Sequence, residues 1–152
     1  MVEKDAVIER QHYKGLAWVA SMALFMQSLD ATILNTALPT IATDLQTPVF
    51  EMQMAIIAYS LAVALFIPLT AWAAAKFGTL TVFRSAVFTF VFGSVACAMA
   101  TSLATLVLAR ILQGIGGAFM MPVARLAIIQ TVPKNQLINA WNLMATAGLI
   151  GP

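Results

Sequence analysis

The sequence predicts an all-α polytopic membrane protein, and three observations carry this prediction. Hydrophobic residues make up 61% of the 152-residue chain and charged residues only 9%, with a mean hydropathy of +0.91. A soluble domain normally has about 25% charged residues. Four long apolar segments alternate with short polar links, and Lys and Arg fall in every second link. The eight basic residues are scattered rather than clustered, which argues against a nucleic-acid partner.

The predicted elements follow the apolar segments in order. We expect a polar cytoplasmic tail at 1–15 and a partial transmembrane bundle at 16–152, with spans at about 16–38, 54–75, 82–100 and 104–126 and an incomplete span at 137–152. A helix of 23 residues from Leu16 covers ~34 Å, enough for a bilayer core of ~30 Å. Pro39 is expected to end the first span, and Pro68 and Pro122 to kink later ones. Because the last segment is short for a span, we expect a fragment of a longer protein.

The distribution of Lys and Arg predicts the orientation of the bundle. Three links or ends carry all of these residues except Arg110: the tail (Lys4, Arg10 and Lys14), the link after the second span (Lys76 and Arg84), and the region after the fourth (Arg125 and Lys134). The other two links have none. Positive residues concentrate in cytoplasmic loops, so we expect the amino terminus to be cytoplasmic.

Asp30 is the single charged residue of the first predicted span. A carboxylate inside a span is costly unless it faces the protein interior, a partner or water. On a helical wheel Gln27, Asp30 and Asn35 share one arc, and large apolar residues occupy the opposite arc. We therefore expect this arc to face the bundle interior or a cavity, and the opposite arc to face lipid. The alternative is a carboxylate that only tethers helices or caps a kink.

Arg110 begins a second polar stripe, in the fourth predicted span. Gln113, Gly114 and Gly117 follow it at helical spacing. The glycines allow another helix to approach closely, and the two polar side chains can donate to a carboxylate. Asp30 and Arg110 both lie ~9–12 Å from the outer end of their spans, at matched depth. We expect an ion pair in which Arg110 stabilises ionised Asp30 in one conformation and releases it in another. The alternative is helix packing with a structural arginine.

The sequence predicts neither a cofactor nor a metal site. Cys97 and His12 are the only cysteine and the only histidine, so the usual zinc ligands are absent. An intramembrane enzyme is disfavoured because the predicted spans have no histidine and no carboxylate other than Asp30.

Three motifs resemble the major facilitator superfamily. SLDATILNTALP at 28–39 is similar to the first-span LDxTIVNxALP pattern of its fourteen-helix drug:proton antiporter branch. LARILQGIGGA at 108–118 resembles the fourth-span motif whose arginine, here Arg110, is associated with proton coupling. GLIGP at 148–152 resembles the start of the antiporter motif of the fifth span. The resemblance implies a partial amino-terminal six-helix half, with the lipid bilayer, protons and small amphiphilic molecules as partners.

One motif departs from the family pattern. The link after the second span is GxLADRxGRK in the family and AWAAAKFGTL at 71–80 here. Lys76 and Gly78 are retained, but Ala75 replaces the aspartate. The resemblance implies that this loop sets the equilibrium between conformations. The sequence therefore leaves two functions open: proton-coupled efflux, or a truncated or decayed membrane protein that does not transport.

Overall fold

The computed structural model describes the backbone of residues 2–132, 137, 138, 142 and 146. Its elements are α1 (Val2–Asp44), α2 (Val49–Phe66), the 3-10 helix η1 (Ile67–Leu69), α3 (Thr70–Phe77), α4 (Thr79–Ala98) and α5 (Leu103–Thr131). The described elements are helices throughout, as predicted. Most of the predicted segment at 137–152, including the motif at 148–152, lies outside the described residues.

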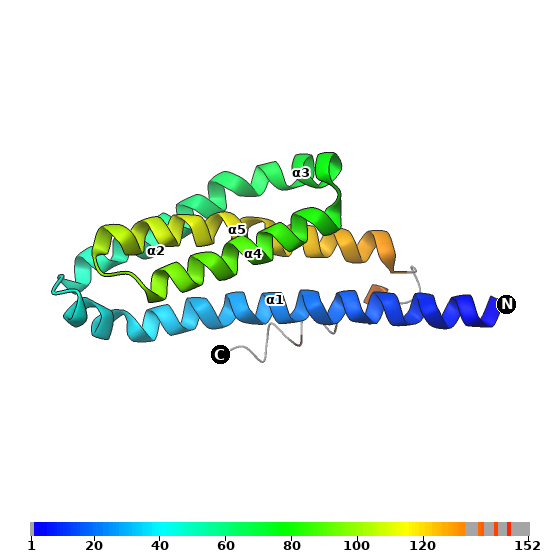
Figure 1. Cartoon of the computed structure of the whole chain (residues 1–152), viewed down its shortest axis with the longest axis horizontal. Coiled ribbons are helices and arrows are strands. Elements are labelled where there is room, and N and C mark those ends of the chain that lie inside the picture. The colour runs from blue at the N-terminus through cyan, green and yellow to red at the C-terminus, as the bar shows by residue number, and fades with distance from the viewer. Residues whose placement is uncertain (1, 133–136, 139–141, 143–145, 147–152) are drawn as a thin grey trace.

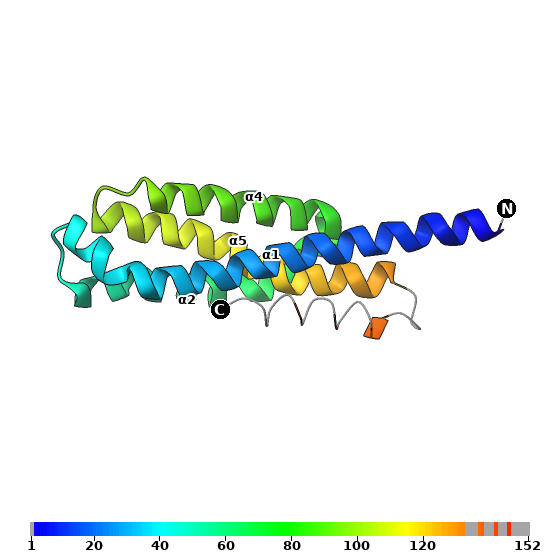
Figure 2. The ribbon, with the colours of Figure 1, turned by 90° about the horizontal axis from the view of Figure 1, so that it is seen from below.

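Helix α1 is longer than the predicted first span at both ends, and its amino-terminal part extends past the other helices (Figures 1 and 2). The predicted tail is therefore continuous with the helix. The prediction that Pro39 ends the span was wrong, because the helix continues to Asp44. A proline removes one backbone hydrogen bond, a small loss this close to the end of a helix. The helix stops where Gln46 adopts a left-handed φ of 50° and the Thr47 amide donates to the Ala42 carbonyl at 2.9 Å.

The second predicted span is a broken rod. Helices α2 and α3 are joined by η1, and the interruption falls at Pro68, as the sequence predicts. The rod runs from Val49 to Phe77, beyond the predicted limits of 54 and 75. An apolar run marks the part of a helix that crosses the bilayer, whereas the helix itself can continue into polar surroundings. Pro122 lies within the unbroken α5.

Three of the described helical rods are long and apolar enough to cross a membrane: Val49–Phe77, Thr79–Ala98 and Leu103–Gln130. The first predicted span, at 16–38, lies within α1, and its place in the membrane stays a prediction.

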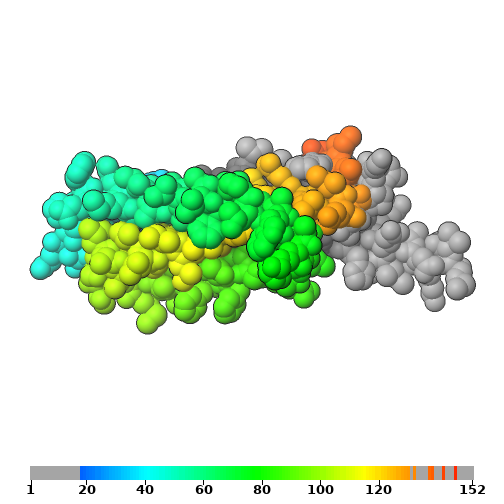
Figure 3. All heavy atoms as spheres, turned by 90° about the horizontal axis from the view of Figure 1, so that it is seen from above, coloured from blue at the N-terminus to red at the C-terminus, as the bar shows by residue number. Residues whose placement is uncertain are grey.

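Helix α5 lies at the centre of the bundle and contacts the other rods. Figure 3 shows one face on which α5 lies between the α2–α3 rod and α4. Ser102 begins α5 with a reciprocal cap: its hydroxyl accepts from the Thr105 amide, and the Thr105 hydroxyl accepts from the Ser102 amide. The cap fixes the tight turn between α4 and α5.

Small residues let α5 approach both neighbours. A Cβ atom added to Gly116 would lie 2.5 Å from the backbone nitrogen of Phe90 on α4. One added to Gly114 would lie 2.7 Å from the carbonyl oxygen of Tyr59 on α2. Two apolar clusters form around these contacts, one including Leu24 and the other Leu34 on α1. Large apolar side chains such as Phe50, Phe88 and Met99 are exposed on the outside, where lipid would cover them.

Replacing Gly116 with alanine is expected to destabilise the packing of α4 on α5. The added methyl group meets the α4 backbone, which has no freedom to rotate away, so we expect a loss of about 1–3 kcal/mol in the free energy of unfolding. Unfolding of the full-length protein in detergent measures it. Ala104→Val, at an exposed position of the same helix, is the matched control. Equal stability of the Gly116→Ala protein and the control would contradict the close approach.

Candidate functional site

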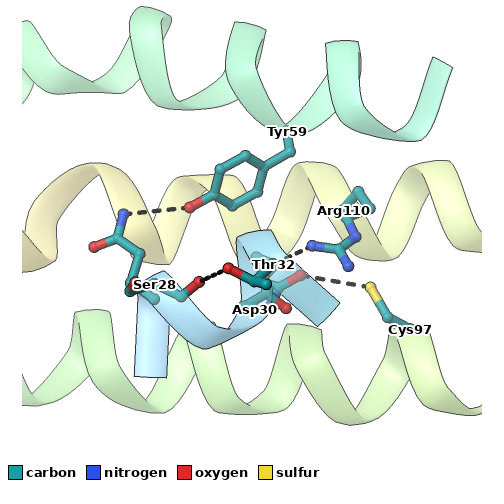
Figure 4. Close-up of polar contacts among 8 residues, drawn as sticks. Ser28, Asp30, Thr32, Tyr59, Cys97 and Arg110 are labelled. Carbon is teal, nitrogen blue, oxygen red and sulfur yellow. Dashed lines mark hydrogen bonds and ion pairs between the residues drawn. The ribbon is translucent and has the colours of Figure 1, made fainter. Parts of the chain in front are cut away.

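Asp30 lies at the centre of a buried polar cluster (Figure 4). Its Oδ2 atom accepts a hydrogen bond from Nη1 of Arg110 at 2.8 Å, and its Oδ1 atom accepts from Nε2 of Gln113 at 2.8 Å. The side chains of Arg110 and Asp30 are only 6% and 15% exposed. Burying an unpaired charge costs several kcal/mol, so each charge requires the other in this position.

The cluster joins α1 to α5. Arg110 and Gln113 are three residues apart and therefore lie on one face of α5, from which both reach the same carboxylate. On α1, Asp30 lies between Leu24 and Leu34, which belong to the two separate apolar clusters. The ion pair thus lies between two apolar clusters, which reduces its screening by bulk water.

Helix α4 holds Gln113 from the other side. Gly93 leaves room for the Gln113 backbone, because a Cβ atom there would lie 2.7 Å from the Gln113 nitrogen. One turn further along, the thiol of Cys97 donates to Oε1 of Gln113 at 3.6 Å. Gln113 is completely buried. With its oxygen facing a thiol, its amide nitrogen is directed at the carboxylate of Asp30.

A second polar contact lies one turn earlier on α1. Gln27 donates from Nε2 to the hydroxyl of Tyr59 on α2 at 3.3 Å (Figure 4). Gly117 makes room for that hydroxyl, since a Cβ atom there would lie 2.8 Å from it. Within the described part of the chain, Oε1 of Gln27 and Nε of Arg110 are buried without a hydrogen-bond partner. The site therefore retains one acceptor and one donor for a further polar group.

The structure brings together most, but not all, of the residues that the sequence singled out. Gly114 and Gly117 face α2, which fits the predicted close approach of a neighbouring helix. Asn35 is exposed, and none of the hydrogen bonds described for Asp30 involves it. Asn35 is five residues after Asp30, which turns it away from the contact with α5.

Lys76 and Gly78 lie apart from the cluster, at the turn between α3 and α4. The Lys76 ammonium lies 4.9 Å from the ring centre of Trp72. Gly78 has a φ of 83°, which a side chain would strain, and it allows the two helices to reverse direction. Next to it the Thr79 hydroxyl donates to Oε1 of Gln130 at 2.8 Å, which ties the turn to the end of α5. A gating role for this loop stays a prediction.

Three residues of the site were missed by the sequence reasoning. Tyr59 lies in an uncharged apolar segment, and its hydroxyl was the only available signal. Gly93 continues a four-residue spacing of small residues with Ser85 and Thr89, a helix-packing signal that was not used. Cys97 was considered only as a metal ligand, and its contact with Gln113 depends on how α4 packs against α5.

Comparisons with known proteins identify the family. Residues 20–152 match the family model of the Major Facilitator Superfamily. The "Probable transport protein HsrA" of Haemophilus influenzae is 83% identical over 144 residues, which cover 95% of this chain and 31% of that protein. The "Putative multidrug resistance protein MdtD" is 44% identical in both Salmonella typhi and Yersinia pestis, over 89% of this chain and 29% of those proteins.

This chain thus spans about a third of the length of these curated relatives. No solved structure gives a significant match to it. The family match extends over all the described helices from residue 20 onward, including both halves of the ion pair. The chain is an integral membrane protein, all-α and polytopic, and it belongs to the Major Facilitator Superfamily of transporters.

Proposed function

We propose that the full-length protein is a secondary active transporter that exports small amphiphilic compounds in exchange for protons. The observation that carries this proposal is the buried contact of Asp30 with Arg110 and Gln113. A carboxylate can bind and release a proton, and this one lies within the apolar part of a membrane protein. Intramembrane carboxylates of this kind mark proton and substrate pathways.

The geometry indicates how a proton changes the packing. Ionised Asp30 accepts one hydrogen bond from each of two donors on α5. Protonation removes its charge and turns one oxygen into a donor, so the carboxyl group no longer matches two donors. Arg110 then needs another acceptor. Because the carboxylate is on α1 and both donors are on α5, the proton alters the contact between two helices. Such a change biases a protein between conformations.

The choice of cargo is supported by the relatives and by the site. Two of the relatives are named for multidrug resistance. Near the Tyr59 hydroxyl, Oε1 of Gln27 and Nε of Arg110 are enclosed without partners, and they would meet a polar group of an amphiphile once the helices separate. Because this chain covers about a third of those relatives, the rest of any substrate site would come from other parts of the protein.

The wild-type full-length protein is expected to drive transport with a pH gradient. Reconstituted into liposomes that are acidic inside, it should accumulate at least one compound from a panel of lipophilic cations and neutral dyes. Protein-free liposomes and liposomes treated with a protonophore are the controls. Equal uptake with and without the gradient, for every compound, would favour the alternative of a membrane protein that does not transport. The altered link at 71–80 is the observation that favours this alternative.

We also propose that the protein lies in the bacterial inner membrane with its amino terminus in the cytoplasm. The bacterial relatives support the inner membrane, and the alternation of Lys and Arg along the sequence supports the orientation. A protease site placed directly after Met1 should be cut in inside-out membrane vesicles and protected in intact spheroplasts. The reverse pattern would contradict this orientation.

A further inference from the structure

A groove on the outside of the bundle has no part in the ion pair. It lies between α3, α4 and α5, on the face shown in Figure 3, and encloses about 390 Å³. The space is left by small residues, among them Ala73, Ala86 and Gly116. Larger apolar residues flank it, among them Phe77, Ile115 and Phe119. Because Phe77 is 55% exposed, the groove is open to the surroundings of the bundle.

The walls of the groove favour a hydrocarbon over a polar ligand. Three hydroxyl groups line it, those of Thr81, Ser85 and Thr89, and the last two are used within α4 itself. The Ser85 hydroxyl donates to the Val82 carbonyl at 2.9 Å, and the Thr89 hydroxyl donates to the Ser85 carbonyl at 2.8 Å. The remaining surface is mostly apolar. A polar molecule would lose its hydration here without gaining many hydrogen bonds.

One end of the groove is positively charged. Lys76 lies over the ring of Phe77, a groove residue, with its ammonium 5.4 Å from the ring centre. Arg84 is exposed and is three residues after Thr81, which is at the edge of the groove, so Arg84 lies beside the groove and outside its lining. The sequence has no Asp or Glu after Glu51. Neither cation therefore has an acidic neighbour on α3, α4 or α5.

The charge and the shape together match one kind of molecule. From Thr81 to Thr89 the groove follows α4 for about 12 Å at 1.5 Å per residue and leads away from Lys76. We propose that the groove binds one acyl chain of an anionic phospholipid, with the lipid phosphate held by Lys76 and Arg84. Basic pockets between transmembrane helices bind anionic headgroups in this way. The lipid site does not depend on proton coupling at Asp30.

Native mass spectrometry of the full-length protein tests this site. The protein is released from detergent in the presence of equal amounts of dioleoyl phosphatidylglycerol and dioleoyl phosphatidylcholine. We expect one phosphatidylglycerol to stay bound in preference to phosphatidylcholine. Lys76→Gln and Arg84→Gln should each weaken that preference roughly fivefold, as expected for one basic residue at an anionic lipid. Arg84→Lys, which keeps the charge, should retain it.

Filling the groove gives an independent readout. Ser85→Phe places a ring in the groove at an exposed position and should displace the lipid, whereas Val95→Phe, at an exposed position of α4 outside the groove, should not. Equal retention of the two lipids by the wild-type protein would overturn the proposal. This is the result expected if another segment of the full-length protein fills the groove. Unchanged retention in both charge variants would overturn it as well, even if Ser85→Phe failed to fold.

Discussion

Asp30→Asn is expected to reduce proton-driven accumulation by the full-length protein to the level of protein-free liposomes. Asparagine has nearly the same shape as aspartate, and its side-chain oxygen can still accept a hydrogen bond from Arg110 or Gln113. It cannot bind and release a proton at neutral pH. The loss should therefore concern the coupling to protons rather than the fold.

Asp44→Asn is the matched control for this substitution. Asp44 is an exposed carboxylate at the end of the same helix, about 21 Å from Asp30 along α1 at 1.5 Å per residue. It should leave uptake at the wild-type rate. If Asp30→Asn accumulated substrate as fast as Asp44→Asn under the same pH gradient, another group would have to carry the proton.

Arg110→Met is expected to have the largest effect on stability. Methionine fills a similar volume but leaves the Asp30 carboxylate buried without its counter-charge. Breaking one side of a buried ion pair typically lowers the free energy of unfolding by about 3–5 kcal/mol. Unfolding of the full-length protein in detergent by increasing fractions of SDS measures the loss. Leu108→Met, at an exposed position of the same helix, should be close to neutral in stability.

A double substitution separates lost attraction from lost packing. In the Arg110→Met protein, Asp30→Asn removes the charge that has been left alone, so part of the lost stability should return. The two substitutions are then non-additive, as expected for residues in direct contact. Additive losses would show that the contact of 2.8 Å contributes little to stability.

Much of this fold follows from short-range features of the sequence. Long apolar runs predict helices, because the backbone of a membrane-spanning segment must form its hydrogen bonds internally. The break at Pro68 follows from the missing amide of proline. The helix ends were predicted less well: α1 continues through Pro39 to Asp44, because its end is set by the left-handed backbone at Gln46.

The site was predictable in part for the same reason. Helical spacing put Arg110 and Gln113 on one face, and matched depth made a contact with Asp30 possible. The partners from other helices could not be derived, since Tyr59 and Cys97 reach the site only through the packing of α2 and α4 on α5. Asn35 shows the converse. It shares an arc with Asp30 on a wheel but takes no part in the hydrogen bonds described for Asp30, and its place in a cavity stays a prediction.

Substrate exchange without a pH gradient tests the role of Asp30 most directly. Liposomes containing the full-length Asp30→Asn protein are loaded with an unlabelled compound that the wild-type protein transports, and entry of the labelled compound is measured at equal pH on both sides. If Asp30 couples protons to conformation, this exchange should persist at close to the wild-type rate, although gradient-driven accumulation is lost. Loss of exchange in a protein that unfolds like the wild type would contradict that role and would assign Asp30 to substrate binding or structure. Retained gradient-driven accumulation would contradict it as well.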